Sequence, residues 1–487
     1  MTSIARANAV ARCQEKDILI PRFAEQRDPS TVDPVVRAGL EGVDAQAVHP
    51  LNLFRITWHN DPTTGGFGPV DALEIPPELS GVPARIVGLV GRHFPTGAHK
   101  VGAAFGCLVP RLVTGEFDPT VNRAVWPSTG NYCRGGAFDS ALLGCRAVAI
   151  LPEEMSRERF EWLESVGAEI IATPGCESNV KEIFDACWEI RRTRPEAVIF
   201  NQFDEFGNYL WHYGVTGPAA VEVFRAAAGT RGRLAAWVSA TGSAGTLAAG
   251  DWLKRELPGT MIVAAEALQC PTLLRSGFGA HRIEGIGDKH VPWIHNARNT
   301  DVVAAVDDEA TVRLLRLFNE PAGHDLLARR GVAAGLVERL PLLGLSSICN
   351  LLAAVKTARA FELGPDDVLL TCFTDSAGLY RSRLAELTAA RGPYTETDAL
   401  VDLERYLLGC AADHLRELGY EGRKAIHNLK YFTWVEQQGK TVEALDALWS
   451  PSFWADLADR LPEWDEAIDA FNAETGVLAR LRGEVAS

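Results

Sequence analysis

Short apolar, β-branched runs alternate with longer amphipathic stretches through the middle of this chain. The runs at 85–90, 124–126, 147–151, 169–172, 197–201, 234–239, 261–265 and 368–372 have the length and composition of buried strands. Stretches such as 156–166, 179–193, 217–228, 245–256 and 346–362 carry apolar residues at helical spacing. Strands separated by helices of this length predict βαβ units, a mainly parallel sheet and hence an α/β fold.

The two ends of the chain do not follow this alternation. Residues 1–84 predict a loop-rich N-terminal segment. Residues 391–487 predict a packed helical region, with helices expected at 398–408, 411–418, 442–448 and 465–481. Tryptophans at 434, 449, 454 and 464 favour packing of this region over a flexible tail.

Composition narrows the classes of function. Of the 487 residues, 47% are hydrophobic and 23% charged, which is typical of globular proteins, and the net charge is −15. A negative field disfavours nucleic acid and anionic lipid as partners. The N-terminus predicts no signal peptide, and the longest uncharged stretches predict no membrane span. The 10 cysteines are scattered, which predicts reduced thiols in a cytoplasmic protein and no metal site.

A lysine follows a Gly-containing turn directly after the run at 85–90. The string PTGAHK ends at Lys100, and the small-residue stretch VGAAFGCL follows it. A desolvated lysine is the residue type that forms a Schiff base with an aldehyde cofactor. Taken alone, the segment better fits a lysine that caps a helix in solvent.

Three further loops stand at strand ends. Residues 128–136 (STGNYCRGG) offer hydroxyl, amide and backbone donors to an anion, although an N-capped turn has the same pattern. Residues 240–246 (ATGSAGT) form a Gly-rich loop before a helix, which suits one phosphate group, and they lack the GxG of a dinucleotide turn. Asp375 and Ser376 follow the strand at 368–372, at the edge where open α/β sheets bind ligands.

In this order, the four segments resemble the fold type II pyridoxal-phosphate enzymes, the group of tryptophan synthase β, O-acetylserine sulfhydrylase, cystathionine β-synthase and threonine dehydratase. TGAHK resembles tryptophan synthase β, and residues 201–218 and 283–292 (IEGIGDKHVP) resemble cysteine synthases. FTDSAGLY, at 373–380, resembles cystathionine β-synthase. The resemblance covers about residues 85–385.

The resemblance implies a two-domain fold in which helices flank parallel sheets. The large domain, which binds pyridoxal 5'-phosphate, would comprise residues 85–114 and 212–390, and a small substrate-loop domain would comprise residues 115–211. Residues 1–84 and 391–487 would remain outside both domains as the N-terminal segment and the helical C-terminal extension.

The resemblance also implies roles for individual residues. Lys100 would bind pyridoxal phosphate as a Schiff base and move the substrate Cα proton, Asn131 would hydrogen-bond the 3′-oxygen of the cofactor, and Ser376 would contact its ring nitrogen. The phosphate would be held by the backbone of Gly242, Ser243, Ala244, Gly245 and Thr246. The substrate carboxylate would be held by Ser128, Thr129, Gly130, Tyr132 and Gln202.

The implied activity is α,β-elimination or β-replacement on a small amino acid with a leaving group at Cβ, through an aminoacrylate, in a homodimer. The string GNYCRG departs from cysteine synthases and comes closer to the GNHGRG of diaminopropionate ammonia-lyase, so the substrate stays open. Cys133 is either a reactive thiol or a packing residue.

Two alternatives remain. The chain could be the cofactor-bearing β subunit of a heteromeric enzyme such as 2-amino-4-oxopentanoate thiolase. It could also be an NAD-dependent oxidoreductase with VSATGSAGT as its dinucleotide loop and Glu266 on the ribose, which the missing GxG disfavours. A yellow purified protein would separate the pyridoxal enzyme from the oxidoreductase.

Overall fold

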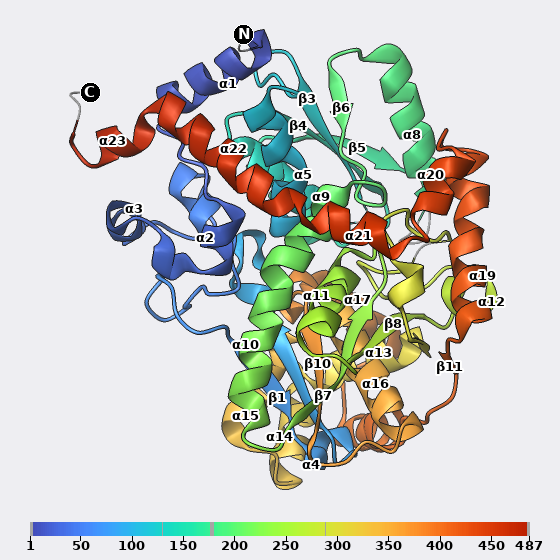
Figure 1. Ribbon diagram of the computed structural model, residues 1–487. Coiled ribbons are helices and arrows are strands. Elements are labelled where there is room, and N and C mark those ends of the chain that lie inside the picture. Colours follow the sequence, from blue (N-terminus) through green and yellow to red (C-terminus); the bar gives the residue numbers. More distant parts are fainter. Residues whose placement is uncertain (1–2, 129, 176–179, 288, 485–487) are drawn as a thin grey trace.

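A computed structural model describes residues 3–128, 130–175, 180–287 and 289–484, and these residues form two β-sheets (Figure 1). The large sheet has seven strands in the order β1-β2-β10-β7-β8-β9-β11. Its strands are β1 (Ala72–Ile75), β2 (Arg85–Val90), β10 (Asp367–Phe373), β7 (Arg233–Ala240), β8 (Met261–Ala267), β9 (Val302–Val306) and β11 (Leu415–Glu417). The five central strands are parallel, whereas both edge strands are antiparallel to their neighbours.

The small sheet is parallel throughout, with the order β5-β4-β3-β6. Its strands are β3 (Arg123–Pro127), β4 (Arg146–Pro152), β5 (Glu169–Thr173) and β6 (Ala197–Ile199). The predicted α/β fold with parallel sheets is therefore confirmed, and each predicted strand has its counterpart. The domain boundaries stay a prediction.

Helices surround both sheets within the described residues (Figure 1). The α-helices are α1 (Ile4–Glu15), α2 (Phe23–Arg27), α3 (Pro34–Gly39), α4 (Pro77–Ser80), α5 (Lys100–Thr114), α6 (Asn131–Leu142), α7 (Arg157–Ser165), α8 (Val180–Thr193), α9 (Phe206–Trp211), α10 (Gly217–Ala228), α11 (Ala248–Glu256), α12 (Thr272–Arg275), α13 (Asp308–Leu317), α14 (Pro321–Arg329), α15 (Ala334–Arg339), α16 (Leu345–Ala360), α17 (Arg381–Arg391), α18 (Glu396–Asp402), α19 (Tyr420–Lys430), α20 (Val442–Ala447), α21 (Pro451–Ala458), α22 (Arg460–Thr475) and α23 (Val477–Leu481).

Alternation along the central strand β10 divides the apolar core into two halves. Val368, Leu370 and Cys372 pack on one face of the sheet, in the same cluster as residues of α5, α10 and α11. Leu369 and Phe373 pack on the other face with residues of α13 and α16. Because both faces are covered by helices, these strands are apolar at nearly every position, as buried parallel strands are.

The chain ends contribute to this fold. Strand β1 comes from the predicted N-terminal segment, and β11 comes from the predicted C-terminal extension. The helix predicted at 411–418 is wrong, because Leu415–Glu417 instead pairs antiparallel with β9. A strand of three residues is too short to show a period, so its partner strand decides its conformation.

The N-terminal and C-terminal segments also pack on each other. Helix α22 runs beside α1 in Figure 1, and the Asp465 carboxylate accepts hydrogen bonds from the backbone N–H groups of Phe23 and Ala24. Phe23 and Ala24 are the first two residues of α2, where backbone N–H groups lack partners within the helix. The extra C-terminal helices are therefore part of the packed fold.

Within the described residues, no single helix is long and apolar enough to cross a membrane. One bent pair of helices, Ala334–Leu342 and Leu345–Ala360, meets the length and composition criteria when taken together.

The crossing of α5 and α9 provides a test of the packing. A Cβ atom on Gly106 would lie 2.4 Å from the carbonyl oxygen of Gly207, which is backbone and cannot rotate away. We expect Gly106→Ala to lower the free energy of unfolding by about 1–3 kcal/mol, the usual cost of overpacking. The matched control is Gly335→Ala in α15, where a Cβ meets nothing within 4 Å, and it should raise stability by a few tenths of a kcal/mol. Urea denaturation measures both, and equal effects would contradict the packing argument.

Candidate active site

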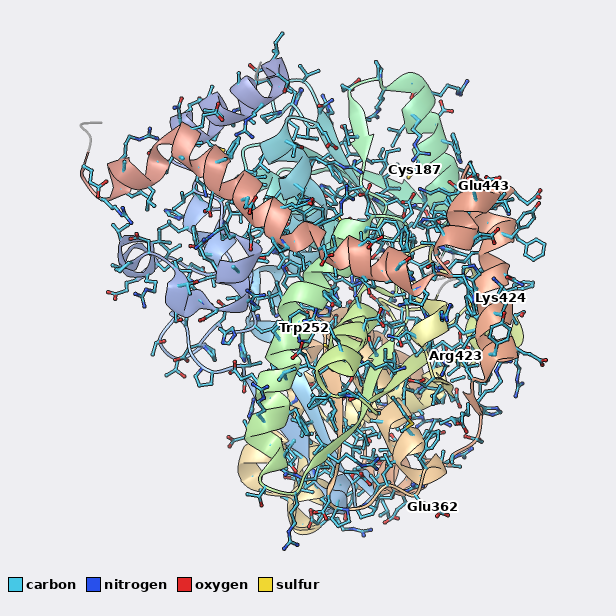
Figure 2. All side chains as sticks on the ribbon, in the orientation of Figure 1. Cys187, Trp252, Glu362, Arg423, Lys424 and Glu443 are labelled. Carbon is cyan, nitrogen blue, oxygen red and sulfur yellow. The ribbon has the colours of Figure 1, made fainter. Side chains whose placement is uncertain are left out.

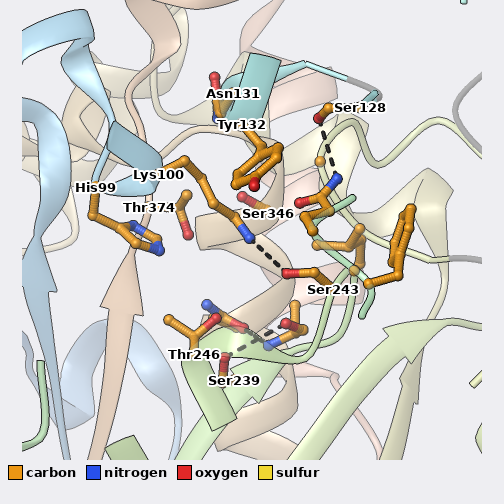
Figure 3. A pocket seen from close by; sticks show the side chains of 17 residues that line it. His99, Lys100, Ser128, Asn131, Tyr132, Ser239, Ser243, Thr246, Ser346 and Thr374 are labelled. Atoms are coloured by element: carbon orange, nitrogen blue, oxygen red, sulfur yellow. Dashed lines mark hydrogen bonds between the residues drawn. The ribbon is translucent and has the colours of Figure 1, made fainter. Parts of the chain in front are cut away.

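A buried cavity lies where the carboxyl ends of the strands of both sheets meet. Ser239 and Ala240 end β7, Thr374 follows β10, and Ser128 follows β3, and all four line the cavity. The carboxyl edge of parallel strands is the expected place for a ligand in α/β folds. Lys100 reaches into this cavity from the start of α5 (Figure 3).

The turn before α5 determines where Lys100 lies. Thr96 and Gly97 adopt left-handed backbone angles, with φ of 68° and 74°, so the chain reverses sharply between β2 and α5. Gly91 lets β2 approach the strand end of β10, because a Cβ there would lie 2.5 Å from the Thr374 carbonyl oxygen. The Lys100 Nζ then donates a hydrogen bond to the Ser243 Oγ at 3.2 Å (Figure 3).

His99, the residue before this lysine, also lines the cavity. Its ring stacks on Trp58, with 5.5 Å between ring centroids, and is almost fully buried. Burial and the neighbouring Lys100 amine lower the pKa of His99 to about 3. The ring is therefore neutral at physiological pH and adds no second positive charge beside the lysine.

The Gly-rich loop at 240–246 is shaped by close contacts. Ala244 has φ of 64°, and a Cβ on Gly245 would lie 2.0 Å from the Asn208 Oδ1. The Asn208 Nδ2 donates to the Ser243 Oγ at 2.9 Å and to the Gln202 carbonyl oxygen at 3.0 Å. The short turn Gly245–Leu247 then leads into α11. A helix N-terminus that faces a cavity and carries hydroxyl groups is suited to an anion such as phosphate.

Three of the five predicted phosphate-loop residues line the cavity, namely Gly242, Ser243 and Thr246. Ala244 and Gly245 belong to the same loop but are not lining residues. Their contribution is to the loop's shape, through the left-handed turn and the space left for Asn208.

The predicted substrate loop enters α6 on the opposite wall. The Ser128 Oγ accepts hydrogen bonds from the Gln202 Nε2 at 3.2 Å and from the Gly130 N–H at 3.1 Å. Ser128, Gln202 and Tyr132 line the cavity, whereas Gly130 does not. A Cβ on Gly130 would overlap the Arg159 Nη1, so the glycine leaves room for that guanidinium. Thr129 lies outside the described residues.

Asn131, the first residue of α6, is held by a buried carboxylate. Its Nδ2 donates to the Asp375 Oδ2 at 2.7 Å, and the Tyr380 hydroxyl donates to the same oxygen at 2.8 Å. Burial raises the pKa of Asp375. The Asn131 Oδ1 is buried without a protein partner, and Asn131 lines the cavity. Its amide can therefore serve a bound group.

The structure adds a second candidate for the ring-nitrogen contact predicted for Ser376. Ser376 is not among the residues that line the cavity, and it occupies the N-cap position of the short turn Ala377–Leu379 without a side-chain capping hydrogen bond. The cavity is lined instead by Thr374, two positions earlier, and by Ser346 and Asn350 of α16 (Figure 3). Asp375, the residue before Ser376, accepts a hydrogen bond from Asn131, and the contact between Ser376 and the cofactor ring stays a prediction.

Cys133 is a packing residue in this structure. Its thiol is fully buried and donates to the Gly130 carbonyl oxygen at 2.9 Å. Burial raises the pKa of Cys133 to about 12, so the thiolate is not available as a nucleophile near neutral pH.

Glu266 likewise has a structural role, which argues against the contact with a ribose that the oxidoreductase alternative requires. Its carboxylate accepts hydrogen bonds at 2.8 Å from the backbone N–H groups of Leu273 and Leu274. A carboxylate that satisfies the start of α12 in this way is not free for a ribose.

Several lining residues were not among the predicted site residues. Ser346 and Asn350 lie in a stretch predicted only as a helix, whereas Phe203 and Ile286 lie in the two stretches that resemble cysteine synthases, 201–218 and 283–292, without a predicted role. The serine pair after Gly344, at the start of that helix, is the pattern that could have indicated Ser346.

The donors around the cavity fit pyridoxal phosphate. A buried lysine amine faces the space for an aldehyde, and hydroxyl groups at a helix N-terminus face the space for one phosphate. The Asn131 amide, with its buried unpartnered oxygen, faces the same cavity.

Curated relatives with similar sequences are amino-acid enzymes. A probable cysteine synthase of Bacillus subtilis is 28% identical over 289 residues, which cover 59% of this chain and 85% of that protein. Cysteine synthase B of Campylobacter jejuni is 30% identical over 291 residues, with 59% and 87% covered. Cystathionine beta-synthase of Saccharomyces cerevisiae is 27% identical over 339 residues, with 67% and 63% covered.

Solved structures share the fold. A hydrogen sulfide-producing enzyme of Fusobacterium nucleatum superimposes with a TM-score of 0.54 at 20% identity, covering 64% of this chain and 96% of that one. A cysteine synthase of Entamoeba histolytica gives a TM-score of 0.55 at 21% identity, with 68% and 92% covered.

The match to a protein family includes every residue that lines the cavity. Residues 89–375 match the family described as pyridoxal-phosphate dependent enzyme, and this range includes Lys100, the Gly-rich loop and the wall at Ser346. The chain therefore belongs to the pyridoxal-phosphate-dependent enzymes, of the cysteine synthase and cystathionine β-synthase fold, and its cofactor is pyridoxal phosphate.

Proposed function

We propose that this enzyme catalyses α,β-elimination or β-replacement on a small amino acid with a leaving group at Cβ. The observation that carries the proposal is the placement of Lys100, whose amine lies at the Gly-rich loop and faces the wall formed by Ser128 and Gln202. One cavity thus brings together a lysine, a loop that would hold a phosphate and residues that would hold a carboxylate. Cysteine synthases and cystathionine β-synthase among the relatives support the same class of reaction.

The residues divide into those that hold the cofactor and those that hold the substrate. Lys100 would bind the aldehyde carbon of the cofactor, and Ser243 and Thr246, with the backbone of the loop, would bind its phosphate. Asn131 would hydrogen-bond the phenolic oxygen, and Ser346 would face the ring nitrogen in place of Ser376. When bound, pyridoxal phosphate supplies an electron sink for the Cα carbanion.

The proton chemistry belongs to Lys100. The Lys100 amine would accept the proton of the substrate Cα, because it lines the cavity and lies at the loop that would hold the cofactor. Ser128 and Gln202 would orient the substrate carboxylate, and Thr129 stays a predicted member of that set. Tyr132 and Phe203 restrict the space beside these residues, which supports a small substrate.

We also propose that the enzyme acts as a homodimer in the cytoplasm. The nine cysteines within the described residues are buried and lie outside disulfides, which supports a reducing compartment. The homodimer rests on the family resemblance, and sedimentation of the purified holoenzyme tests it.

Reduction of the holoenzyme tests the lysine assignment. We expect borohydride to fix the cofactor on Lys100 alone, because Lys100 is the lysine that lines the cavity within the described residues. Digestion and mass spectrometry locate the pyridoxyl group. A label on Lys254, whose amine lies 2.6 Å from the Asp301 carboxylate, or on Lys181 would overturn the assignment.

A methyl group on Gly245 tests the phosphate loop. Since a Cβ there would lie 2.0 Å from the Asn208 Oδ1, Gly245→Ala must displace Asn208 and with it the Ser243 hydroxyl. We expect the dissociation constant for pyridoxal phosphate to rise at least about tenfold, equivalent to about 1.4 kcal/mol. Fluorescence titration measures it, with Gly335→Ala as the control that should keep wild-type affinity. An unchanged constant in folded Gly245→Ala would place the phosphate elsewhere.

Serine variants test the ring-nitrogen assignment. Ser346→Ala should shift the absorption band of the bound cofactor and weaken its binding about fivefold, the effect of losing one hydrogen bond of about 1 kcal/mol. Ser376→Ala is the matched control and should behave like the wild type, since its side chain does not line the cavity. The reverse pattern would restore Ser376 as the ring partner.

A further inference from the structure

A C-terminal segment outside the family match lies against one wall of the active site. Helix α19 and the π-helical turn Tyr431–Val435 that follows it, residues 420–435, are here called the brace. The family match ends at residue 375, and the solved Fusobacterium structure covers 64% of this chain although 96% of its own length is matched. The brace therefore belongs to what this chain adds to the common fold. Figure 2 shows Arg423 and Lys424 of α19 at the edge of the molecule.

The inner face of the brace carries a fully buried lysine. The Lys430 Nζ donates to the carbonyl oxygen of Trp293 at 2.8 Å and to that of His295 at 2.7 Å. Its side chain is 0% exposed, and no carboxylate of the described residues forms an ion pair with it. Burial lowers the pKa of Lys430 well below its usual value. The two carbonyl groups thus take two N–H donors of this amine.

A second donor of the brace holds the same loop. The Trp434 Nε1 donates to the Val291 carbonyl oxygen at 2.8 Å, and the indole is fully buried. Three alternate carbonyl groups, at 291, 293 and 295, thus accept hydrogen bonds from the brace, and the one at 295 also accepts the Ala297 N–H at 2.9 Å. Without these donors the buried carbonyl groups of Val291 and Trp293 would lose the hydrogen bonds that the brace supplies, and unsatisfied buried carbonyl groups are costly.

The same loop supports residues that line the cavity. The Ile294 N–H donates to the Phe203 carbonyl oxygen at 3.2 Å, and the His290 ring packs edge-on against the Phe203 ring, with 4.8 Å between centroids. His290 also contacts Trp434, with 5.7 Å between centroids. Phe203 lines the cavity beside Gln202. The contacts therefore run from the brace through the loop to the substrate side of the cavity.

One ion pair anchors the brace itself, and a second anchors the chain just after it. The Arg423 guanidinium lies 2.6 Å from the Asp301 carboxylate next to β9. Beyond the brace, the Lys440 amine lies 2.9 Å from the carboxylate of Asp204, which is the residue after Phe203. One end is thus tied to the large sheet and the other to the segment that follows β6.

We propose that the brace is a positioning element of the active site, in which Lys430 and Trp434 fix the loop at 289–296 and thereby the wall at Phe203. The part of this proposal that concerns substrate binding rests on the proposed function. Lys430 and Trp434 touch neither cofactor nor substrate and act through the loop. The fixed wall holds the substrate carboxylate side of the cavity at constant width, so loss of the brace should weaken substrate binding more than it slows the chemical step.

The test compares three variants of the full-length holoenzyme. Lys430→Met keeps the volume and removes both donors, and Trp434→Phe keeps an aromatic ring and removes one donor. Lys424→Met on the outer part of α19 is the matched control, since the Lys424 amine contacts the Trp449 ring and not the loop. Hydrogen–deuterium exchange of the peptide at 289–299 is measured beside steady-state kinetics with O-acetyl-L-serine as the probe.

We expect exchange at 289–299 to rise about tenfold in Lys430→Met and less in Trp434→Phe, while peptides from β2 and β10 stay protected. KM for the probe should rise about tenfold, equivalent to about 1.4 kcal/mol, with kcat within about twofold of wild type. Should Lys430→Met fail to fold, Trp434→Phe carries the same comparison. Lys424→Met should match the wild type throughout.

Other outcomes overturn the proposal and remain separate from failure of the proposed function. Unchanged exchange at 289–299 would show that the brace does not hold the loop. Raised exchange with unchanged KM, or with kcat lowered as much as kcat/KM, would show that the loop does not position the substrate wall. If the wild type does not turn over the probe at all, the proposed reaction fails for that substrate. Two measurements then still decide whether the brace acts on the cavity: hydrogen–deuterium exchange at 289–299, and the affinity of each holoenzyme for the probe, measured from the absorption of the cofactor.

Discussion

The hydrogen bond between the Lys100 amine and the Ser243 hydroxyl joins the two halves of the active site, and the surrounding backbone is arranged to permit it. Ser243 also accepts a hydrogen bond from Asn208, which occupies the space that any side chain at Gly245 would need. On the lysine side, the left-handed turn at Thr96 and Gly97 brings α5 back over the strand ends. A displacement of either loop would break this contact. The glycines are therefore needed for the close approach of neighbouring groups as much as for backbone conformations that other residues rarely adopt.

A buried polar network fixes how the small sheet meets the large one. Arg159 of α7 lies 3.2 Å from the Glu284 carboxylate and donates to the Tyr380 hydroxyl, which in turn donates to Asp375. Removing one partner from such a network leaves a buried charge uncompensated, at a cost of about 3–5 kcal/mol. Because Asp375 also holds Asn131, the network that joins the sheets orients a side chain that faces the cofactor site.

The sequence predicted the parts of this enzyme that depend on local pattern. Strands such as β2 and β7 are long apolar runs, and Lys100 and the Gly-rich loop sit at strand-to-helix junctions that the pattern marks. It failed where the outcome depends on distant pairing, as in β11, whose three residues become a strand only beside β9. It also did not indicate Ser346, because this serine reaches the cavity from a helix that is remote in sequence from the loops that the pattern marks.

The C-terminal extension illustrates why a family resemblance left part of the site undescribed. The loop at 289–296 lies in the shared region, yet its carbonyl groups at 291 and 293 accept hydrogen bonds from residues 434 and 430, beyond that region. A buried carbonyl must be satisfied wherever the partner comes from. The conformation of a loop inside the family fold is therefore set partly by sequence outside it. In this chain the extension and the wall at Phe203 form one structural unit, and the aromatic contacts from Trp434 through His290 to Phe203 make that unit continuous.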